Sequence, residues 1–121
     1  MVKITKTGYY GHALSLDKKD DRLPKFKVQR ETLGFDDTET WNLDYAIIGF
    51  IQPRLRRFIE IAPIAWDSDE GHLQAIKDIR EVDRIFTHCV ENEDYEYQPN
   101  YDKDLRKAWK LLIKNINYLW W

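Results

Sequence analysis

From Trp41 onward, apolar residues recur at steps of three and four, which is the spacing of one face of an α-helix. The positions that carry this repeat are Leu43, Ile47, Ile51, Leu55 and Phe58. Acidic and hydroxyl side chains precede the repeat, and such residues suit the positive end of a helix dipole. We therefore predict a helix over residues 42–61, whose apolar face constrains how the rest of the chain packs.

Pro53 lies inside this repeat. Proline removes one backbone hydrogen bond and crowds the carbonyl four residues earlier, which here belongs to Gly49. Glycine is the residue that adapts most easily to such crowding. We predict one helix that is kinked at Pro53 and ends at Ala62-Pro63. The alternative is two helices with a break near Gln52.

Two further helices follow from the same periodicity. Asp67 to Glu70 has the spacing of a capping box, and the apolar pattern after it predicts a helix over 68–90. This second pattern consists of Leu73, Ile76, Ile79, Val82, Phe86 and Cys89. The last predicted helix covers 102–120, with a seam formed by Leu105, Trp109, Leu112, Ile116 and Leu119.

The N-terminal residues carry a different pattern. Val2 and Ile4 alternate with polar residues, as do Phe26 and Val28 within residues 25–29, and this alternation is typical of short strands. We predict a small extended or β-hairpin element over residues 1–37 beside a helical core over 38–121. The expected fold is a single mainly α domain, since 121 residues suffice to bury a core.

Tryptophans are expected to shape that core. We interpret Trp41 as a core side chain beside the helix-start carboxylate of Asp44, and Trp109 as part of the last helical seam. Trp120 and Trp121 are expected to close the core, because Leu119 continues the same apolar stripe. The alternative is that the terminal pair forms an interface, such as that of a homodimer.

Composition limits the chemistry. Cys89 is the only cysteine, so an intrachain disulfide and a four-cysteine zinc site are excluded. On an ideal helix His72 and His88 lie about 160° apart around the axis, which prevents them from sharing a metal ion. We therefore predict no catalytic residues, no metal site and no cofactor. The chain also lacks a signal peptide pattern and a long apolar run, so we expect a cytoplasmic protein without a membrane partner.

One stretch is strongly acidic and aromatic. Residues 91–104 hold six acidic residues and one lysine, interleaved with three tyrosines. Such a surface imitates nucleic acid and suits a basic groove on a partner. The candidate partner-binding residues are Glu91, Glu93, Asp94, Tyr95, Glu96 and Tyr97. The alternative is a solvated loop whose acids favour the N-terminus of the next helix.

Two segments are basic instead. Residues 18–30 hold six basic and two acidic residues, although the formal net charge of the whole chain is -2. Arg54, Arg56 and Arg57 form a second basic patch that suits phosphate or carboxylate groups. These three arginines spread around a helix, so the alternative is a solvated face with local ion pairs.

Four short motifs resemble a family of small uncharacterised proteins of tailed phages and prophages. They are the basic stretch 25–30, Gly-Phe-Asp-Asp at 34–37, Thr-Trp-Asn-Leu-Asp at 40–44 and Pro-Arg-Leu-Arg-Arg-Phe at 53–58. The C-terminal Tyr-Leu-Trp-Trp at 118–121 is similar to the aromatic end of that family. The resemblance implies a viral context in a bacterial host and a mostly helical fold, and it implies no chemistry.

We therefore predict a non-enzymatic phage or prophage accessory protein that acts by binding a host macromolecule. The specific hypothesis is a host protein partner and inhibition of a bacterial defence system. One alternative is a nucleic-acid-associated protein that uses the basic residues of the N-terminal arm and the first helix. Another is a small enzyme or nucleotide-binding protein with an unrecognised site.

Overall fold

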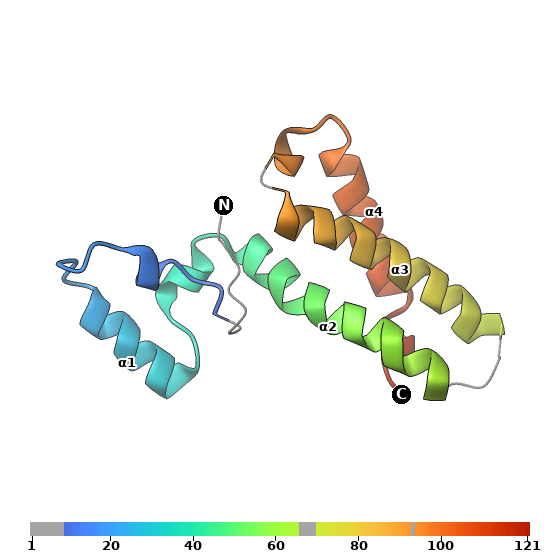
Figure 1. Cartoon of the computed structure of the whole chain (residues 1–121), viewed down its shortest axis with the longest axis horizontal. Coiled ribbons are helices and arrows are strands. Elements are labelled where there is room, and N and C mark those ends of the chain that lie inside the picture. Colours follow the sequence, from blue (N-terminus) through green and yellow to red (C-terminus); the bar gives the residue numbers. More distant parts are fainter. Residues whose placement is uncertain (1–8, 66–69, 93) are drawn as a thin grey trace. The chain divides into compact units, whose positions relative to one another are not determined.

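The computed structural model describes residues 9–65, 70–92 and 94–121, and within these residues all regular secondary structure is helical. The α-helices are α1 (Leu23–Leu33), α2 (Leu43–Ala65), α3 (Glu70–Glu91) and α4 (Tyr101–Lys114) (Figure 1). The short 3₁₀ turns are η1 (Ala13–Ser15), η2 (Asp37–Thr40), η3 (Tyr95–Tyr97) and η4 (Ile116–Tyr118). The predicted mainly α class is confirmed. No helix among the described residues has the length and apolar character needed to cross a membrane.

The chain forms two compact units, with the border inside α2. Unit 1 comprises Met1–Phe50 and unit 2 comprises Ile51–Trp121. The sequence analysis placed its internal division after residue 37 instead, between an arm and a helical core. That the whole chain behaves as one domain stays a prediction.

Helix α1 replaces the strand expected at residues 25–29, so that expectation is wrong. Pro24 supplies a backbone angle suited to the first helical turn. Gly34 ends the helix with a φ of 83°, and its N–H donates to the carbonyl of Arg30 over 3.2 Å. These two signals outweigh the alternation of Phe26 and Val28, of which only Phe26 is buried. The other expected strand, at Val2 and Ile4, lies outside the described residues.

Helix α2 is continuous from Leu43 to Ala65 and contains both Pro53 and Pro63. The alternative of two helices broken near Gln52 is therefore wrong, and so is the expected end at Ala62-Pro63. Gly49, one turn before Pro53, carries no Cβ and so limits the crowding around the proline ring. Pro63 falls in the last turn, where it removes a single hydrogen bond. The kink at Pro53 stays a prediction.

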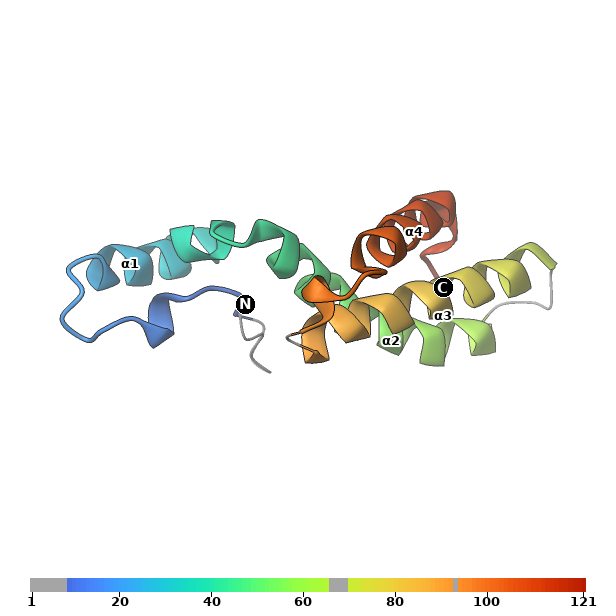
Figure 2. The same ribbon diagram turned by 90° about the horizontal axis from the view of Figure 1, so that it is seen from above.

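Helix α3 forms the centre of unit 2. Its span agrees with the predicted helix over 68–90, of which residues 68 and 69 and the expected cap at Asp67 lie outside the described residues. Leu73 is 56% exposed, so its expected place on the apolar face of this helix is wrong, whereas the other five predicted positions are buried. The buried apolar residues of α3 are Ala75, Ile76, Ile79, Val82, Ile85, Phe86 and Cys89. Helix α4 packs against α3 (Figure 2). The rings of Phe86 and Trp109 lie 5.0 Å apart between the two helices. Trp109 thus contacts α3, and its predicted structural role stays a prediction.

Helix α4 ends at Lys114, six residues before the predicted end at 120. The buried Asn115 follows it, and its amide donates to Asp78 Oδ2 over 3.0 Å and to the Leu111 carbonyl over 2.8 Å. The chain then turns into η4. Trp120 and Trp121 are 59% and 64% exposed, so the expectation that they close the core is wrong. The helical stripe that would have carried them inward ends at Asn115.

Ile79 tests the α3 core. It is fully buried, and we expect Ile79→Ala to lower the unfolding free energy by about 2–4 kcal/mol, through lost burial and the cavity left behind. Chemical denaturation followed by circular dichroism at 222 nm measures this loss. Ile113→Ala is the matched control, because Ile113 is exposed on α4. Equal losses in the two variants would contradict this assignment of the core.

Candidate binding surfaces

A buried carboxylate organises unit 1. Asp36 is fully buried, and Arg30 Nη1 donates to its Oδ2 over 2.6 Å. The Thr38 N–H donates to Oδ1 over 2.9 Å, and the hydroxyls of Tyr9 and Thr38 also donate to the carboxylate. We call Tyr9, Arg30, Asp36 and Thr38 the Asp36 cluster. Its members come from the start of the described chain, from α1 and from η2, so the cluster joins three separate segments.

Charge and burial oppose each other at Asp36. Burial alone would raise the pKa of its carboxyl, whereas the hydrogen bonds from Thr38, Tyr9 and Arg30 favour the charged form. The hydrogen bonds prevail, and the pKa of Asp36 lies below its usual value. The carboxylate therefore stays ionised inside the unit at neutral pH.

The cluster also positions the chain that leads into α2. Glu39 accepts from the Asp36 N–H over 3.0 Å, which completes a capping box at η2. The Thr38 hydroxyl accepts from the N–H groups of His12 and Ala13, over 2.8 and 3.2 Å. A Cβ at Gly11 would lie 2.3 Å from that hydroxyl oxygen, so only glycine fits this close approach.

Trp41 lies at the surface of unit 1 and not in its core. The indole is 46% exposed and stacks on His12, with ring centroids 5.6 Å apart. Phe26 meets it edge-on, and the Arg22 guanidinium lies 5.5 Å from its ring. The expectation of a buried Trp41 is therefore wrong. Asp44, predicted beside it, is exposed in the first turn of α2 and suits the helix dipole there.

The first half of α2 presents apolar side chains to solvent. Leu43, Ile47 and Phe50 are 52%, 42% and 51% exposed. They follow one another at steps of four and three, so they share one helix face. We call these three residues the α2 apolar stripe. The stripe belongs to unit 1 and follows directly on the segment that the Asp36 cluster holds.

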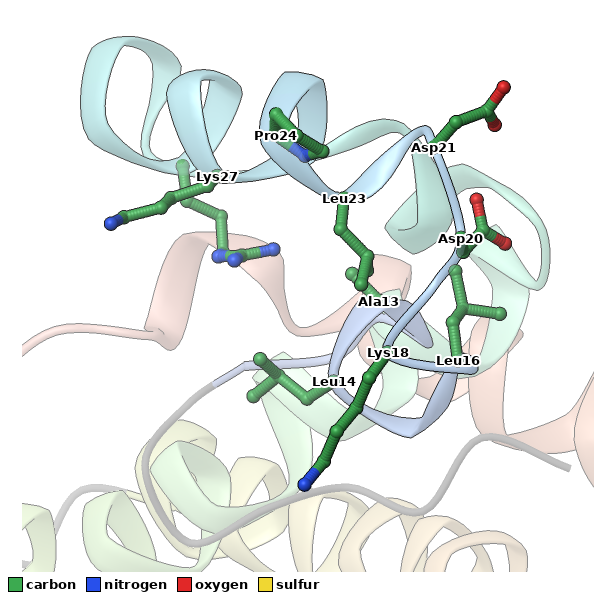
Figure 3. Close-up of a pocket in the computed structure, with 10 residues that line it drawn as sticks. Ala13, Leu14, Leu16, Lys18, Asp20, Asp21, Leu23, Pro24 and Lys27 are labelled. Carbon is green, nitrogen blue, oxygen red and sulfur yellow. The ribbon is translucent and has the colours of Figure 1, made fainter.

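A hollow of about 530 Å³ lies between the η1 turn and the start of α1 (Figure 3). In this view Leu23 points from α1 toward the turn that carries Ala13. Both Lys18 and Asp20 line the hollow, so its rim carries charges of both signs. Because both signs are present, the hollow favours neither an anionic nor a cationic ligand.

The basic segment 18–30 is partly neutralised within the unit, because Arg22, Lys25 and Arg30 pair with Asp20, Asp37 and Asp36.

Only some of the predicted acidic and aromatic residues are exposed. Tyr95 is buried and its hydroxyl donates to Asp104 Oδ2 over 2.8 Å, so this residue holds η3 against α4. The pKa of Tyr95 is raised, mainly because the phenol is buried and secondly because it donates a hydrogen bond to Asp104. Tyr97 is well exposed, as are Glu91 and Asp94, whereas Glu96 is half-buried. Glu93 lies outside the described residues. A partner at this loop stays a prediction.

The predicted basic patch on α2 does not converge. Arg56 donates to Asp83 Oδ2 over 3.3 Å and to the Thr87 hydroxyl over 2.9 Å, both on α3. Arg57 pairs with Glu60 on its own helix over 2.7 Å. Arg54 is exposed. Arg56 and Arg57 are therefore paired with carboxylates of the protein, which is the arrangement of a solvated face with local ion pairs.

His72, His88 and Cys89 have different surroundings in unit 2. His72 packs edge-on against Tyr118, His88 stacks on Tyr95, and Cys89 is buried in α3. In the described part of the chain, no three His, Cys, Asp or Glu side chains are grouped so that they could hold a metal ion.

The chain was also compared with known protein families, with curated proteins and with solved structures. No match was found in any of the three. The resemblance to phage proteins stays a prediction.

Sequence reasoning missed two surfaces. The first is the exposure of the α2 apolar stripe, since an apolar repeat by itself does not tell which of its turns is covered. The second is a row of basic residues on α4: Lys103, Arg106, Lys107, Lys110 and Lys114. Counting basic residues at helical steps would have found this row. The acidic stretch considered in the sequence analysis, residues 91–104, ends where this basic row begins.

Asp36→Asn tests the cluster. We expect a loss of about 3 kcal/mol in the unfolding free energy of unit 1, because Arg30 and the hydroxyl donors lose their charged acceptor. Amide hydrogen exchange over residues 9–42 measures this loss. Asp37→Asn is the matched control, because Asp37 forms an exposed ion pair with Lys25 that contributes little to stability. Wild-type protection in Asp36→Asn would contradict the assigned role.

The same carboxylate makes unit 1 sensitive to acid. Its folded pKa is depressed, so its contribution is present above the unfolded pKa of about 3.9 and is lost as pH falls through the folded value. We expect the protection of residues 9–42 to fall below about pH 4 in the wild type and to depend less on pH in Asp36→Asn. Parallel pH profiles for the two proteins would contradict this expectation.

Proposed function

We propose that the protein acts by binding another protein, and that the α2 apolar stripe is the contact. The observation that carries the proposal is the spacing and exposure of Leu43, Ile47 and Phe50. Residues at i, i+4 and i+7 are the anchors with which an amphipathic helix enters an apolar groove on a partner. The expected partner therefore presents such a groove.

Energetics support this proposal. Each stripe residue leaves roughly half of its side chain in water, so covering one contributes about 1 kcal/mol. Three neighbouring anchors of this kind suit a small interface core, where a few apolar side chains carry most of the affinity. The Asp36 cluster supports the same proposal, because it fixes the segment that enters the helix and limits the entropy lost on binding.

The resemblance to phage proteins supports a host protein as the partner, and a component of a bacterial defence system as the specific candidate. Such a protein would act by occupying a groove that its target uses for assembly or regulation. The exposed residues Glu91, Asp94 and Tyr97 of unit 2 are a separate candidate contact, proposed from the sequence.

The test is Ile47→Asp combined with Phe50→Asp. We expect this double variant to lose a host protein that the wild type captures from bacterial lysate, with at least a tenfold weaker Kd for the purified pair, since charged groups would enter an apolar groove. Quantitative mass spectrometry of the captured proteins, followed by calorimetry, measures both effects.

The control is Ile113→Asp, which places one such charge, where the test variant places two, on an exposed isoleucine of α4. We expect it to bind as the wild type does. Wild-type affinity in the stripe variant would contradict the proposal. The proposal would also be contradicted if light scattering showed that the wild type is a dimer and that the stripe variant is a monomer, because a second copy of the chain would then cover the stripe.

A further inference from the structure

Helix α4 carries five basic residues on one face. Lys103, Lys107, Lys110 and Lys114 follow one another at steps of four, three and four, so they lie within about 60° around the helix axis, with Arg106 beside them. We call these five residues the α4 basic stripe. The two acidic residues of the helix, Asp102 and Asp104, lie about 100° to either side of Lys103. The stripe is thus a row of a single sign in a chain whose formal net charge is -2.

The protein itself engages this row only weakly. Lys107 Nζ lies 3.3 Å from Glu81 and Lys114 Nζ lies 3.0 Å from Asp78, both on α3, yet each lysine keeps more than half of its side chain exposed. Arg106 pairs with Asp102 in a fully open setting. Lys103 and Lys110 form no ion pair among the residues that the structure describes. The Arg106 pair is exposed on both sides and contributes little, whereas the carboxylates of Glu81 and Asp78 are mostly buried and keep Lys107 and Lys114 partly engaged. The cations most open to another anion are therefore Lys103, Arg106 and Lys110.

The stripe has the dimensions of a short phosphate row. From Lys103 to Lys114 it extends about 16 Å along the helix axis. One strand of duplex DNA presents about five phosphates over that length. The residues Lys103, Arg106, Lys107 and Lys110 also border a shallow hollow of about 630 Å³, which Leu111 and the acidic Asp104 line as well.

The residue types suit phosphate. Four of the five residues are lysines, which act as compact point charges and hold phosphate without a fixed orientation. The paired donors of the one arginine suit phosphate and carboxylate alike. Lysine contacts to phosphate carry no base information, so the expected binding is independent of sequence.

We infer that the α4 basic stripe is a binding surface for the phosphodiester backbone of nucleic acid. This surface lies in unit 2 and is separate from the α2 apolar stripe. It is also distinct from residues 18–30 and from Arg54, Arg56 and Arg57, which the sequence suggested for the same ligand. The net negative charge of the protein gives no long-range attraction, so the affinity is modest, in the range of about 10–100 μM at low salt.

The experiment measures binding of a fluorescein-labelled 20-base-pair duplex by anisotropy, at 25–200 mM NaCl. For the wild type we expect the logarithm of the association constant to fall with the logarithm of salt concentration at a slope of about -4. The test variant is Lys103→Gln combined with Lys110→Gln, which leaves the two lysines that contact α3 in place. We expect the slope to flatten by about 2 and Kd to rise at least tenfold at 50 mM NaCl.

The matched control is Lys77→Gln combined with Arg80→Gln. It removes the same charge from exposed positions of α3 and should keep the wild-type slope and a Kd within about twofold. Circular dichroism melting checks that both variants fold. The inference is overturned by absence of duplex binding at 25 mM NaCl, or by an unchanged slope in the stripe variant. Tighter binding of polyglutamate or of anionic phospholipid vesicles than of the duplex also overturns it, since either result assigns the stripe to another class of partner.

Discussion

The buried, ionised carboxylate of Asp36 is the constraint on which unit 1 depends. A charge in the interior is costly unless donors surround it, and here a guanidinium, two hydroxyls and a backbone N–H do so. Because these donors come from separate segments, satisfying the one charge brings the segments together. The resulting frame determines where η2 ends and α2 begins, and hence which residues of α2 belong to its exposed first turns.

Unit 2 has a different basis for stability. Its centre is the apolar face of α3, covered in part by α4, with polar links at the edges such as those from Gln52 to Asp83 and from Asn115 to Asp78. Packing of this kind uses the inward faces of the helices and leaves the outward face of α4 free to carry charge. The α2 apolar stripe thus belongs to a unit organised by a buried charge, and the α4 basic stripe belongs to a unit organised by apolar helix packing.

The sequence predicted the parts of the fold that rest on long periodic patterns. The span and buried face of α3 followed from its apolar spacing, and most of α2 followed in the same way. It misjudged α1, where the alternation of two residues was given more weight than Pro24 and Gly34. The terminal tryptophans were misplaced because nothing in the apolar seam shows that Asn115 turns its side chain inward to Asp78 and ends the helix.

The candidate sites were harder to predict, for a physical reason. Exposure depends on which turn of a stripe another segment covers, and Trp41, Leu43 and Tyr95 all resemble core or surface residues equally well in a linear pattern. The Asp36 cluster was not predicted: only the acidic and hydroxyl character of the segment before α2 was recognised, and the donors Tyr9 and Arg30 lie outside that segment.

The most direct test of this account is the carboxyl pKa of Asp36, measured by ¹³C NMR during an acid titration of the intact protein. The account predicts a value below that of an ordinary aspartate, with the Tyr9 and Thr38 resonances shifting at the same midpoint. A pKa at or above about 4 would contradict it, because the carboxylate would then lack the donors that are held to organise unit 1.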